Sequence, residues 1–179
     1  MSDLTFRSAR KDEIETVFEL LKEAAIWLNG KGIDHWQNWL DPPDSHIRWI
    51  KQGFDTDEFY LVEREGRVIG CFRLQWQDPL FWGERDDCAG YIHTLTTRRD
   101  GAGTGRLVLK LVETYCVERG KQFLRLDCGA INHGLRSYYE SCGFFPVGET
   151  KIEGELLTLY EKTLDNNRLA ETFEGAPQP

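Results

Sequence analysis

A glycine-rich turn, Asp100–Gly105, lies between a strand-like segment and a long helical segment, and it constrains the fold of this chain more than any other feature. The preceding segment, Ala89–Thr97, has the residue types of a β-strand, and the following one extends to Arg119 and ends at Gly120, as helices commonly do. Glycines at such a junction let backbone N–H groups point inward, and the helix start adds a partial positive charge. The turn therefore predicts either a pyrophosphate site or a junction that is glycine-rich for steric reasons alone.

Two familiar phosphate-binding motifs do not match this turn. A P-loop requires a lysine followed by Ser or Thr after its last glycine, and no lysine follows these glycines. A dinucleotide fingerprint requires the spacing GxGxxG, whereas the spacing here is GxGxG. Neither kind of nucleotide site is predicted.

The order of elements along the chain indicates one α/β domain built around a mixed sheet. Strands are predicted at Leu4–Arg7, Phe59–Glu63, Arg67–Trp76, Ala89–Thr97, Phe123–Cys128, Phe144–Val147 and Leu156–Leu164. Helices are predicted at Ile14–Leu28, at Asp44–Gly53, from the glycine turn to Arg119, and at Leu135–Ser141 with Asn132 as its cap. No repeat or linker interrupts residues 1–165, and residues 166–179 are expected to form a frayed tail.

Charge and composition exclude several classes of function. The 179 residues carry 22 Lys and Arg against 30 Asp and Glu, a net charge of −8, which argues against nucleic-acid binding. No apolar run reaches the ~20 residues of a membrane helix, and the first residues do not resemble a signal peptide. The five cysteines have no metal-binding spacing and indicate reduced thiols, mostly in the core. We expect a cytoplasmic protein with no metal site and no membrane partner.

Three blocks of this sequence, Tyr91–Thr97, the glycine turn and Asn132–Phe144, resemble the GNAT superfamily of acetyl-CoA-dependent N-acetyltransferases. The resemblance implies a mixed, mostly antiparallel sheet of six to seven strands flanked by about four helices. It implies a splay between strands four and five, Ala89–Thr97 and Phe123–Cys128, into which acetyl-CoA enters as the acetyl donor. The rival interpretation on the same fold is a non-catalytic acyl-CoA-binding or regulatory module.

The resemblance also implies which residues hold acetyl-CoA. Backbone groups of one strand would bind the pantetheine arm, amides of the turn would bind the pyrophosphate, and Asn132 would contact the arm from the other side. In the best register, Asp100–Gly105, Asp100 stands where the family has Gln or Arg, and Arg98 or Arg99 would compensate for its charge. The alternative register, Arg98–Gly103, satisfies the family pattern but shifts the start of the helix. The residues assigned to the cofactor are Leu95, Thr96, Thr97, Arg98, Arg99, Gly101, Ala102, Gly103, Thr104, Gly105, Arg106 and Asn132.

Direct acetyl transfer needs a proton acceptor for the amine and a proton donor for the leaving thiolate, and it needs no protein nucleophile. The resemblance implies that Tyr139 is the donor, the alternative being a tyrosine that only packs. His93 is the candidate base because strand alternation puts it on one face with Tyr91 and Leu95 and its intrinsic pKa suits proton transfer. A purely structural His93 is the alternative, and carboxylates of the preceding loop are further candidate bases: Glu84, Asp86 and Asp87.

The early helices and the long hairpin are expected to form the acceptor pocket. The acceptor is a primary amine on a small molecule or a peptide, and a homodimer is possible. The six tryptophans fit either an aromatic cage for a cationic amine or core packing. The residues assigned to the acceptor are His35, Trp36, Arg73, Gln75, Trp76 and Trp82.

Overall fold

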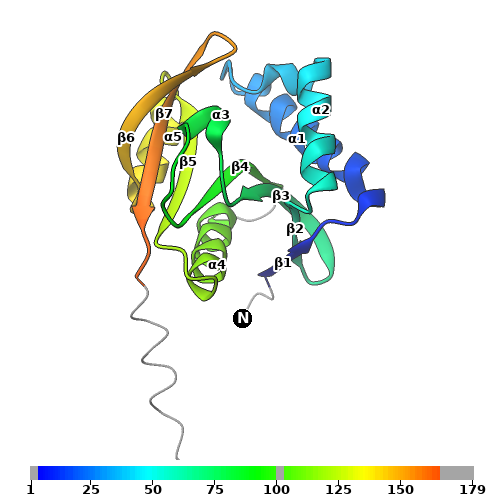
Figure 1. Ribbon diagram of the computed structural model, residues 1–179. Coiled ribbons are helices and arrows are strands. Elements are labelled where there is room, and N and C mark those ends of the chain that lie inside the picture. The colour runs from blue at the N-terminus through cyan, green and yellow to red at the C-terminus, as the bar shows by residue number, and fades with distance from the viewer. Residues whose placement is uncertain (1–3, 100–102, 166–179) are drawn as a thin grey trace, which may run out of the picture. The chain divides into compact units, whose positions relative to one another are not determined.

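The structure, a computed structural model, describes residues 4–99 and 103–165 (Figure 1). The strands are β1 Leu4–Ser8, β2 Phe59–Arg64, β3 Arg67–Gln75, β4 Ala89–Thr97, β5 Phe123–Gly129, β6 Phe145–Ile152 and β7 Glu155–Thr163. The α-helices are α1 Ile14–Gly30, α2 Asp44–Asp55, α3 Pro79–Trp82, α4 Thr104–Glu118 and α5 His133–Ser141. Two short 3-10 turns are η1 Lys11–Glu13 and η2 Gln37–Trp39.

The strands form one mixed sheet in the order β1-β2-β3-β4-β5-β7-β6, in which β4 and β5 run parallel. The pairs β1–β2, β2–β3, β5–β7 and β6–β7 are antiparallel. The predicted fold class is therefore confirmed. The splay between the fourth and fifth strands stays a prediction.

The chain divides into two compact units, each made of two segments. The first unit contains Met1–Gln75 and Ile92–Leu109, and the second contains Trp76–Tyr91 and Lys110–Pro179. The single domain expected at 1–165 stays a prediction, and the expected tail at 166–179 lies outside the described residues.

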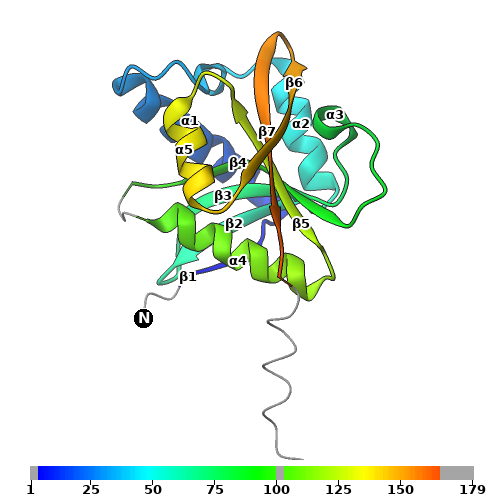
Figure 2. The same cartoon turned by 90° about the vertical axis from the view of Figure 1, so that its left-hand side faces the viewer.

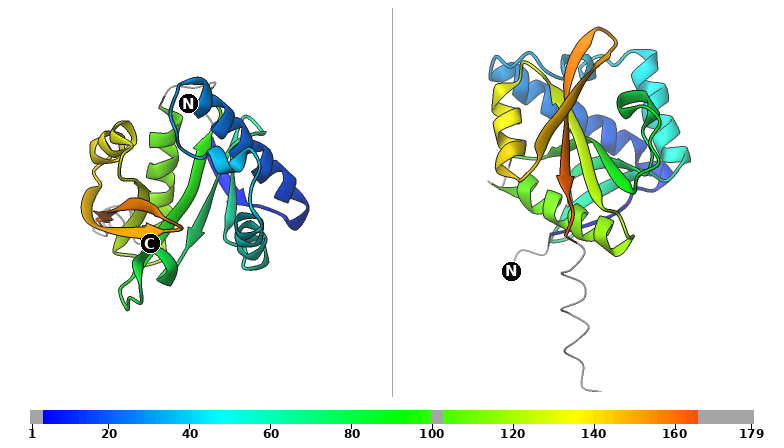
Figure 3. Two further views of the ribbon diagram at one scale, coloured as in Figure 1. Left: turned by 90° about the horizontal axis from the view of Figure 1, so that it is seen from above. Right: turned by 60° about the vertical axis from the view of Figure 1, so that its left-hand side comes forward.

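In the first unit, α1 and α2 cover one face of β2 and β3 (Figure 3). Apolar residues of α1 recur at helical spacing, so one face of the helix is buried. On the strands, Leu61 lies opposite Cys71 and Phe59 lies opposite Arg73, and all four side chains are buried. The core cluster of this unit is Val17, Leu20, Leu21, Ala25, Trp39, Ile50, Phe54, Phe59, Leu61 and Cys71.

In the second unit, β7 lies between β5 and β6, and α5 follows β5 along the chain (Figure 2). The predicted cap of α5 is confirmed because the Asn132 side chain accepts a hydrogen bond from the backbone N–H of Leu135 at 3.1 Å. β6 continues to Ile152, five residues beyond the predicted end at Val147. Its polar, exposed residues carry no strand pattern, and pairing with β7 is what makes them a strand.

The short helix α3 lies between the predicted strands Arg67–Trp76 and Ala89–Thr97, where no helix was predicted. Asp78 caps the helix by accepting a hydrogen bond from the Phe81 N–H at 3.4 Å, and Pro79 occupies the first helical position. Asp followed by Pro is equally typical of a turn, so the sequence does not separate the two. The helix buries Trp82 in a cluster with Ala89, Tyr91 and Leu159.

Candidate active site

The end of β4 and the two residues after it carry five of the twelve predicted cofactor residues, Leu95–Arg99, and β3 approaches this end closely. A Cβ atom at Gly70 of β3 would overlap the carbonyl oxygen of Thr96 and lie 3.0 Å from Cγ2 of Thr97, so only glycine fits there. Thr94 has a φ of +51°, a left-handed conformation that is rare for a β-branched residue. This kink interrupts the regular alternation on which the shared face of His93 and Leu95 was predicted.

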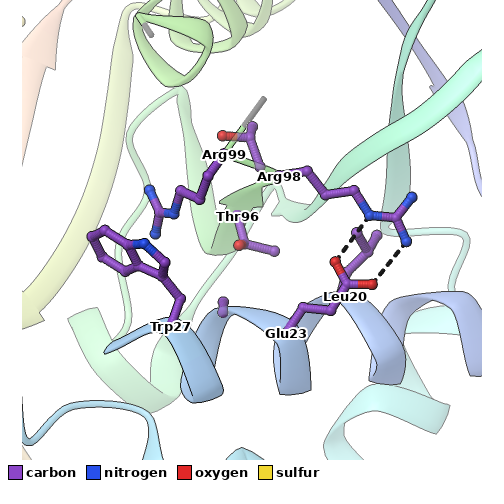
Figure 4. A pocket seen from close by; sticks show the side chains of 8 residues that line it. Leu20, Glu23, Trp27, Thr96, Arg98 and Arg99 are labelled. Atoms are coloured by element: carbon purple, nitrogen blue, oxygen red, sulfur yellow. Dashed lines mark hydrogen bonds and ion pairs between the residues drawn. The ribbon is translucent and has the colours of Figure 1, made fainter. Parts of the chain in front are cut away.

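A cavity of about 360 Å³ lies between α1 and the end of β4, entirely within the first unit (Figure 4). Four of its lining residues, Thr96, Thr97, Arg98 and Arg99, are predicted cofactor residues. The other four are Leu20, Glu23, Ala24 and Trp27 of α1. The early helices were expected to line the acceptor pocket, but none of these four residues was predicted as a site residue. Glu23 and Trp27 are four residues apart and so share one face of α1.

The two arginines at the end of β4 have different partners. Arg98 donates two hydrogen bonds to Glu23, both at 2.9 Å, and one to the Val68 carbonyl oxygen at 3.0 Å. The guanidinium carbon of Arg99 lies 3.9 Å from the centre of the Trp27 ring. Desolvation lowers the pKa of Arg99, so its charged form is less stable than in water.

The glycine turn is described only from Gly103 onward, and the predicted Gly101 and Ala102 lie outside the described residues. Gly103 has a φ of +81°, a conformation that other residues adopt with strain. Thr104 is buried, and its hydroxyl accepts a hydrogen bond from Arg64 at 3.0 Å. Gly105 and Arg106 belong to the first turn of α4, where backbone N–H groups lack partners inside the helix.

His93 is buried, and its imidazole packs edge-on against Trp49 of α2 with ring centres 5.7 Å apart. Trp49 also lies 4.2 Å from the guanidinium carbon of Arg73. Arg73 donates to the Trp49 carbonyl oxygen at 2.9 Å and twice to Glu58, at 2.8 and 2.5 Å. Arg73 thus has a carboxylate partner within the protein, and Trp49, which the sequence analysis missed, positions both side chains.

Tyr139 lies in the second unit and is buried against other aromatic rings. The ring centres of Tyr138, Phe144 and Tyr160 are 5.6, 6.1 and 6.1 Å from that of Tyr139. Burial raises the pKa of the Tyr139 phenol well above its ordinary value, so the group is protonated at neutral pH. Asn132 lies in the same unit, and its side-chain oxygen caps α5 by accepting a hydrogen bond from the Leu135 N–H.

The remaining predicted acceptor residues fall into separate groups. His35 and Trp36 belong to the first unit and stack on each other with ring centres 5.7 Å apart. Gln75, also in the first unit, is half-buried at the end of β3. Trp76 of the second unit stacks on Tyr115 at 6.3 Å. The acceptor assignment stays a prediction for each of these residues.

Trp82 and the candidate base Asp87 both contact Arg125, a buried arginine of β5 in the second unit. Asp87 accepts two hydrogen bonds from Arg125, and these bonds lower the pKa of its carboxyl group. A lowered pKa makes Asp87 a weaker base than an ordinary aspartate. Trp82 lies 5.0 Å from the guanidinium carbon of Arg125. Glu84 and Asp86 are exposed.

Residues 4–99 and 103–165 contain neither a cluster of metal ligands nor a helix that could span a membrane. No group of three or more His, Cys, Asp or Glu side chains is arranged there to hold a metal ion. In that same part of the chain, no helix has the length and apolar character needed to cross a bilayer.

Comparisons with known proteins agree on one family. The sequence profile of the Acetyltransferase (GNAT) family matches residues 14–144. The chain is 26% identical over 144 residues to the uncharacterized N-acetyltransferase YesJ of Bacillus subtilis (strain 168), and the match covers 76% of this chain and 79% of YesJ.

Solved structures show the same similarity. A GNAT-family acetyltransferase from Listeria monocytogenes is 27% identical, with a TM-score of 0.71 over 90% of this chain and 95% of that one. A GNAT-family acetyltransferase from Streptococcus agalactiae, only 15% identical, has a TM-score of 0.73 over 90% of this chain and 96% of that one, and this likeness shows the fold alone.

Proposed function

The chain belongs to the Acetyltransferase (GNAT) family of N-acetyltransferases, and on that premise we propose that it transfers an acetyl group from acetyl-CoA to a primary amine. The acceptor is an amine on a small molecule or a peptide. The transfer is direct, so no side chain of the protein becomes acetylated.

The cavity at the end of β4 is the main structural support for this proposal. Four residues assigned to the cofactor from sequence, Thr96–Arg99, line one cavity of about 360 Å³. Arg99 brings a partly desolvated positive charge to this cavity, and a phosphate is the natural partner of such a charge. The first turn of α4 begins directly after Gly103, and the N-terminal turn of a helix favours bound anions such as phosphate. These features fit a phosphate-bearing acyl donor.

Acetyl-CoA would supply a thioester carbonyl that a neutral amine attacks. Backbone groups of Leu95, Thr96 and Thr97 would hold its pantetheine arm, and the amides of the first turn of α4 would hold its pyrophosphate. Each contact orients the donor, so its effect on catalysis comes through positioning.

Two side chains would handle protons during the transfer. His93 would accept the proton that the amine loses as its nitrogen bonds to the acetyl carbon. Tyr139 would donate its phenolic proton to the sulfur as the carbon–sulfur bond breaks. Burial raises the pKa of Tyr139, so its phenol is protonated at neutral pH but is a weaker acid than a tyrosine in water.

The test is calorimetric titration of the protein with acetyl-CoA, followed by measurement of thiol release in the presence of a panel of amines. We expect micromolar binding that is lost when Gly103 is replaced by a bulky residue, and amine-dependent release of CoA. Binding without release for any amine would favour the non-catalytic acyl-CoA-binding module. No binding of acetyl-CoA would overturn the proposal.

A further inference from the structure

Arg98 and Arg99 are adjacent in sequence, yet α1 gives them different environments. Arg98 turns toward Glu23, and Arg99 turns toward Trp27, one helical turn further along the same face of α1 (Figure 4). Both contacts lie within the first unit and line the same cavity. The difference decides which arginine has a guanidinium left to bind a ligand.

Arg98 is satisfied by the protein itself. Its Nε and Nη2 atoms donate to the two carboxylate oxygens of Glu23, and its Nη1 atom donates to the carbonyl oxygen of Val68. Arg98 lowers the pKa of the Glu23 carboxyl group, so the pair stays ionised at neutral pH. A ligand that bound the Arg98 guanidinium in place of Glu23 would leave the Glu23 carboxylate without its counter-ion.

Arg99 has no such partner. Within residues 4–99 and 103–165, its guanidinium forms no hydrogen bond and no ion pair, and it rests on the indole face of Trp27. When a guanidinium stacks on an aromatic ring, its N–H groups point outward in the plane of the guanidinium and stay available for hydrogen bonds. Lys31 adds a second cation, with Nζ 5.9 Å from the centre of the Trp27 ring. Arg99 therefore brings a positive charge to the cavity of a protein whose net charge is −8.

We propose that Trp27 is a positioning residue that orients Arg99 to bind a phosphate group of the acyl-CoA donor. Arg98 does not bind this phosphate, because its guanidinium is paired with Glu23. This inference rests on the proposed function, because it concerns how the same site binds the acyl-CoA donor. Stacking on Trp27 restricts the rotamers of Arg99 before binding, so less side-chain entropy is lost when the phosphate arrives.

The test compares three donors: acetyl-CoA, acetyl-dephospho-CoA, which lacks only the 3′-phosphate, and acetyl-pantetheine, which lacks all phosphates and the adenosine. Dissociation constants are measured by calorimetry at low ionic strength for the parent and for Arg99→Gln, Trp27→Leu, Trp27→Phe and Arg98→Gln. Trp27 is 37% exposed, so its replacement should preserve the fold, and circular dichroism checks that it does.

Arg99→Gln should weaken acetyl-CoA binding about 10- to 100-fold, the loss expected for charge-assisted hydrogen bonds. Trp27→Leu should also weaken acetyl-CoA binding, but by a smaller factor. Trp27→Phe keeps an aromatic face and should therefore retain most of the affinity that Trp27→Leu loses. Arg98→Gln should lose less affinity than Arg99→Gln, because Arg98 is already paired with Glu23. Arg10→Gln, measured alongside, is the matched control and should stay within about 2-fold of the parent, because Arg10 is exposed and is not among the residues that line the cavity. All variants should bind acetyl-pantetheine as the parent does.

The donor series also identifies the phosphate. If the Arg99→Gln loss disappears with acetyl-dephospho-CoA, Arg99 binds the 3′-phosphate, and if the loss persists, it binds the pyrophosphate. The inference is overturned if Trp27→Leu weakens acetyl-pantetheine and acetyl-CoA equally, or if Arg98→Gln loses as much affinity as Arg99→Gln. A parent protein that binds no donor would overturn the proposed function and this inference together, whereas a binding parent with unaffected variants would overturn the inference alone.

Discussion

Asp87 holds the buried guanidinium of Arg125 with both carboxylate oxygens, at 2.7 and 2.5 Å. Arg125 also donates to the Tyr91 hydroxyl at 2.7 Å and to Glu161 at 2.8 Å. A charge that is only 2% exposed is therefore surrounded by acceptors. This relationship joins the loop before β4 to β5 and β7 within the second unit.

Replacing Arg125 should destabilise the protein. Arg125→Gln removes the shared partner of Asp87 and Glu161, and we expect a loss of about 2 to 3 kcal/mol in the free energy of unfolding. Arg98→Gln, which breaks the exposed Arg98–Glu23 pair, is the control and should cost less than about 1 kcal/mol. Urea denaturation measures both, and equal losses would contradict the structural role given to Arg125.

Acid should destabilise the protein through Glu13. The hydrogen bond from Arg7 is the main cause that lowers the pKa of Glu13 from 4.5 to about 2. Glu13 therefore contributes its full stabilisation above pH 4.5, and this contribution is lost as the pH falls from 4.5 to about 2. Glu13→Gln should be less stable at neutral pH and should lose less stability across that window. A variant whose stability falls as steeply as that of the parent would contradict this assignment.

Gly53 of α2 should not tolerate a side chain. A Cβ atom there would lie 2.6 Å from the Phe59 ring and 2.8 Å from Nε of Arg73, which Glu58 holds in place. Gly53→Ala should therefore cost about 1 to 3 kcal/mol through overpacking. Gly30→Ala at the end of α1 is the matched control, because no atom lies within 4 Å of its Cβ position and the change should be neutral or slightly stabilising. Thermal unfolding compares the two.

Thiol reagents should modify one cysteine rapidly in the native protein. Cys88 is exposed, whereas the other four are buried. Burial raises the pKa of Cys71, Cys116 and Cys128 to about 12, so they contain almost no reactive thiolate at neutral pH. Mass spectrometry after brief iodoacetamide treatment should find one label, and five after unfolding. Rapid labelling of a buried cysteine in the native protein would contradict this prediction and would show that the core opens easily. Cys88→Ser removes the exposed thiol, so that assays of CoA release detect only the thiol of CoA.

Tyr139→Phe should slow acetyl transfer without unfolding the protein. Loss of a general acid typically costs about 100-fold or more in kcat, while KM for the donor should change little. Tyr138→Phe is the control, because it removes a hydroxyl from the adjacent ring and leaves the proposed acid in place. Thiol release with the best amine of the panel measures both. Unchanged turnover in Tyr139→Phe would show that Tyr139 is not the general acid and serves only in packing.

Local chemistry explains the parts of the fold that sequence predicted. Glycines at the β4–α4 junction, Asn132 before α5 and the apolar spacing in α1 act on their immediate neighbours, so their effects can be read from sequence. α3 was missed because Asp78 and Pro79 favour a turn and a first helical turn equally. The full length of β6 was missed because its pairing with β7, rather than any pattern of its own, makes it a strand.

The same distinction applies to the candidate site. The sequence by itself determined the family and the strand–turn–helix order, because these depend on motifs and short spacings, and it predicted the residues from Thr96 to Arg99 as cofactor contacts. Only the tertiary structure decided that Glu23 pairs with Arg98, that Trp27 supports Arg99, and that Trp49 packs against both His93 and Arg73. These contacts join residues more than 20 positions apart, and the packing of α1 and α2 on the sheet creates them, so no local pattern encodes which partner each side chain finds.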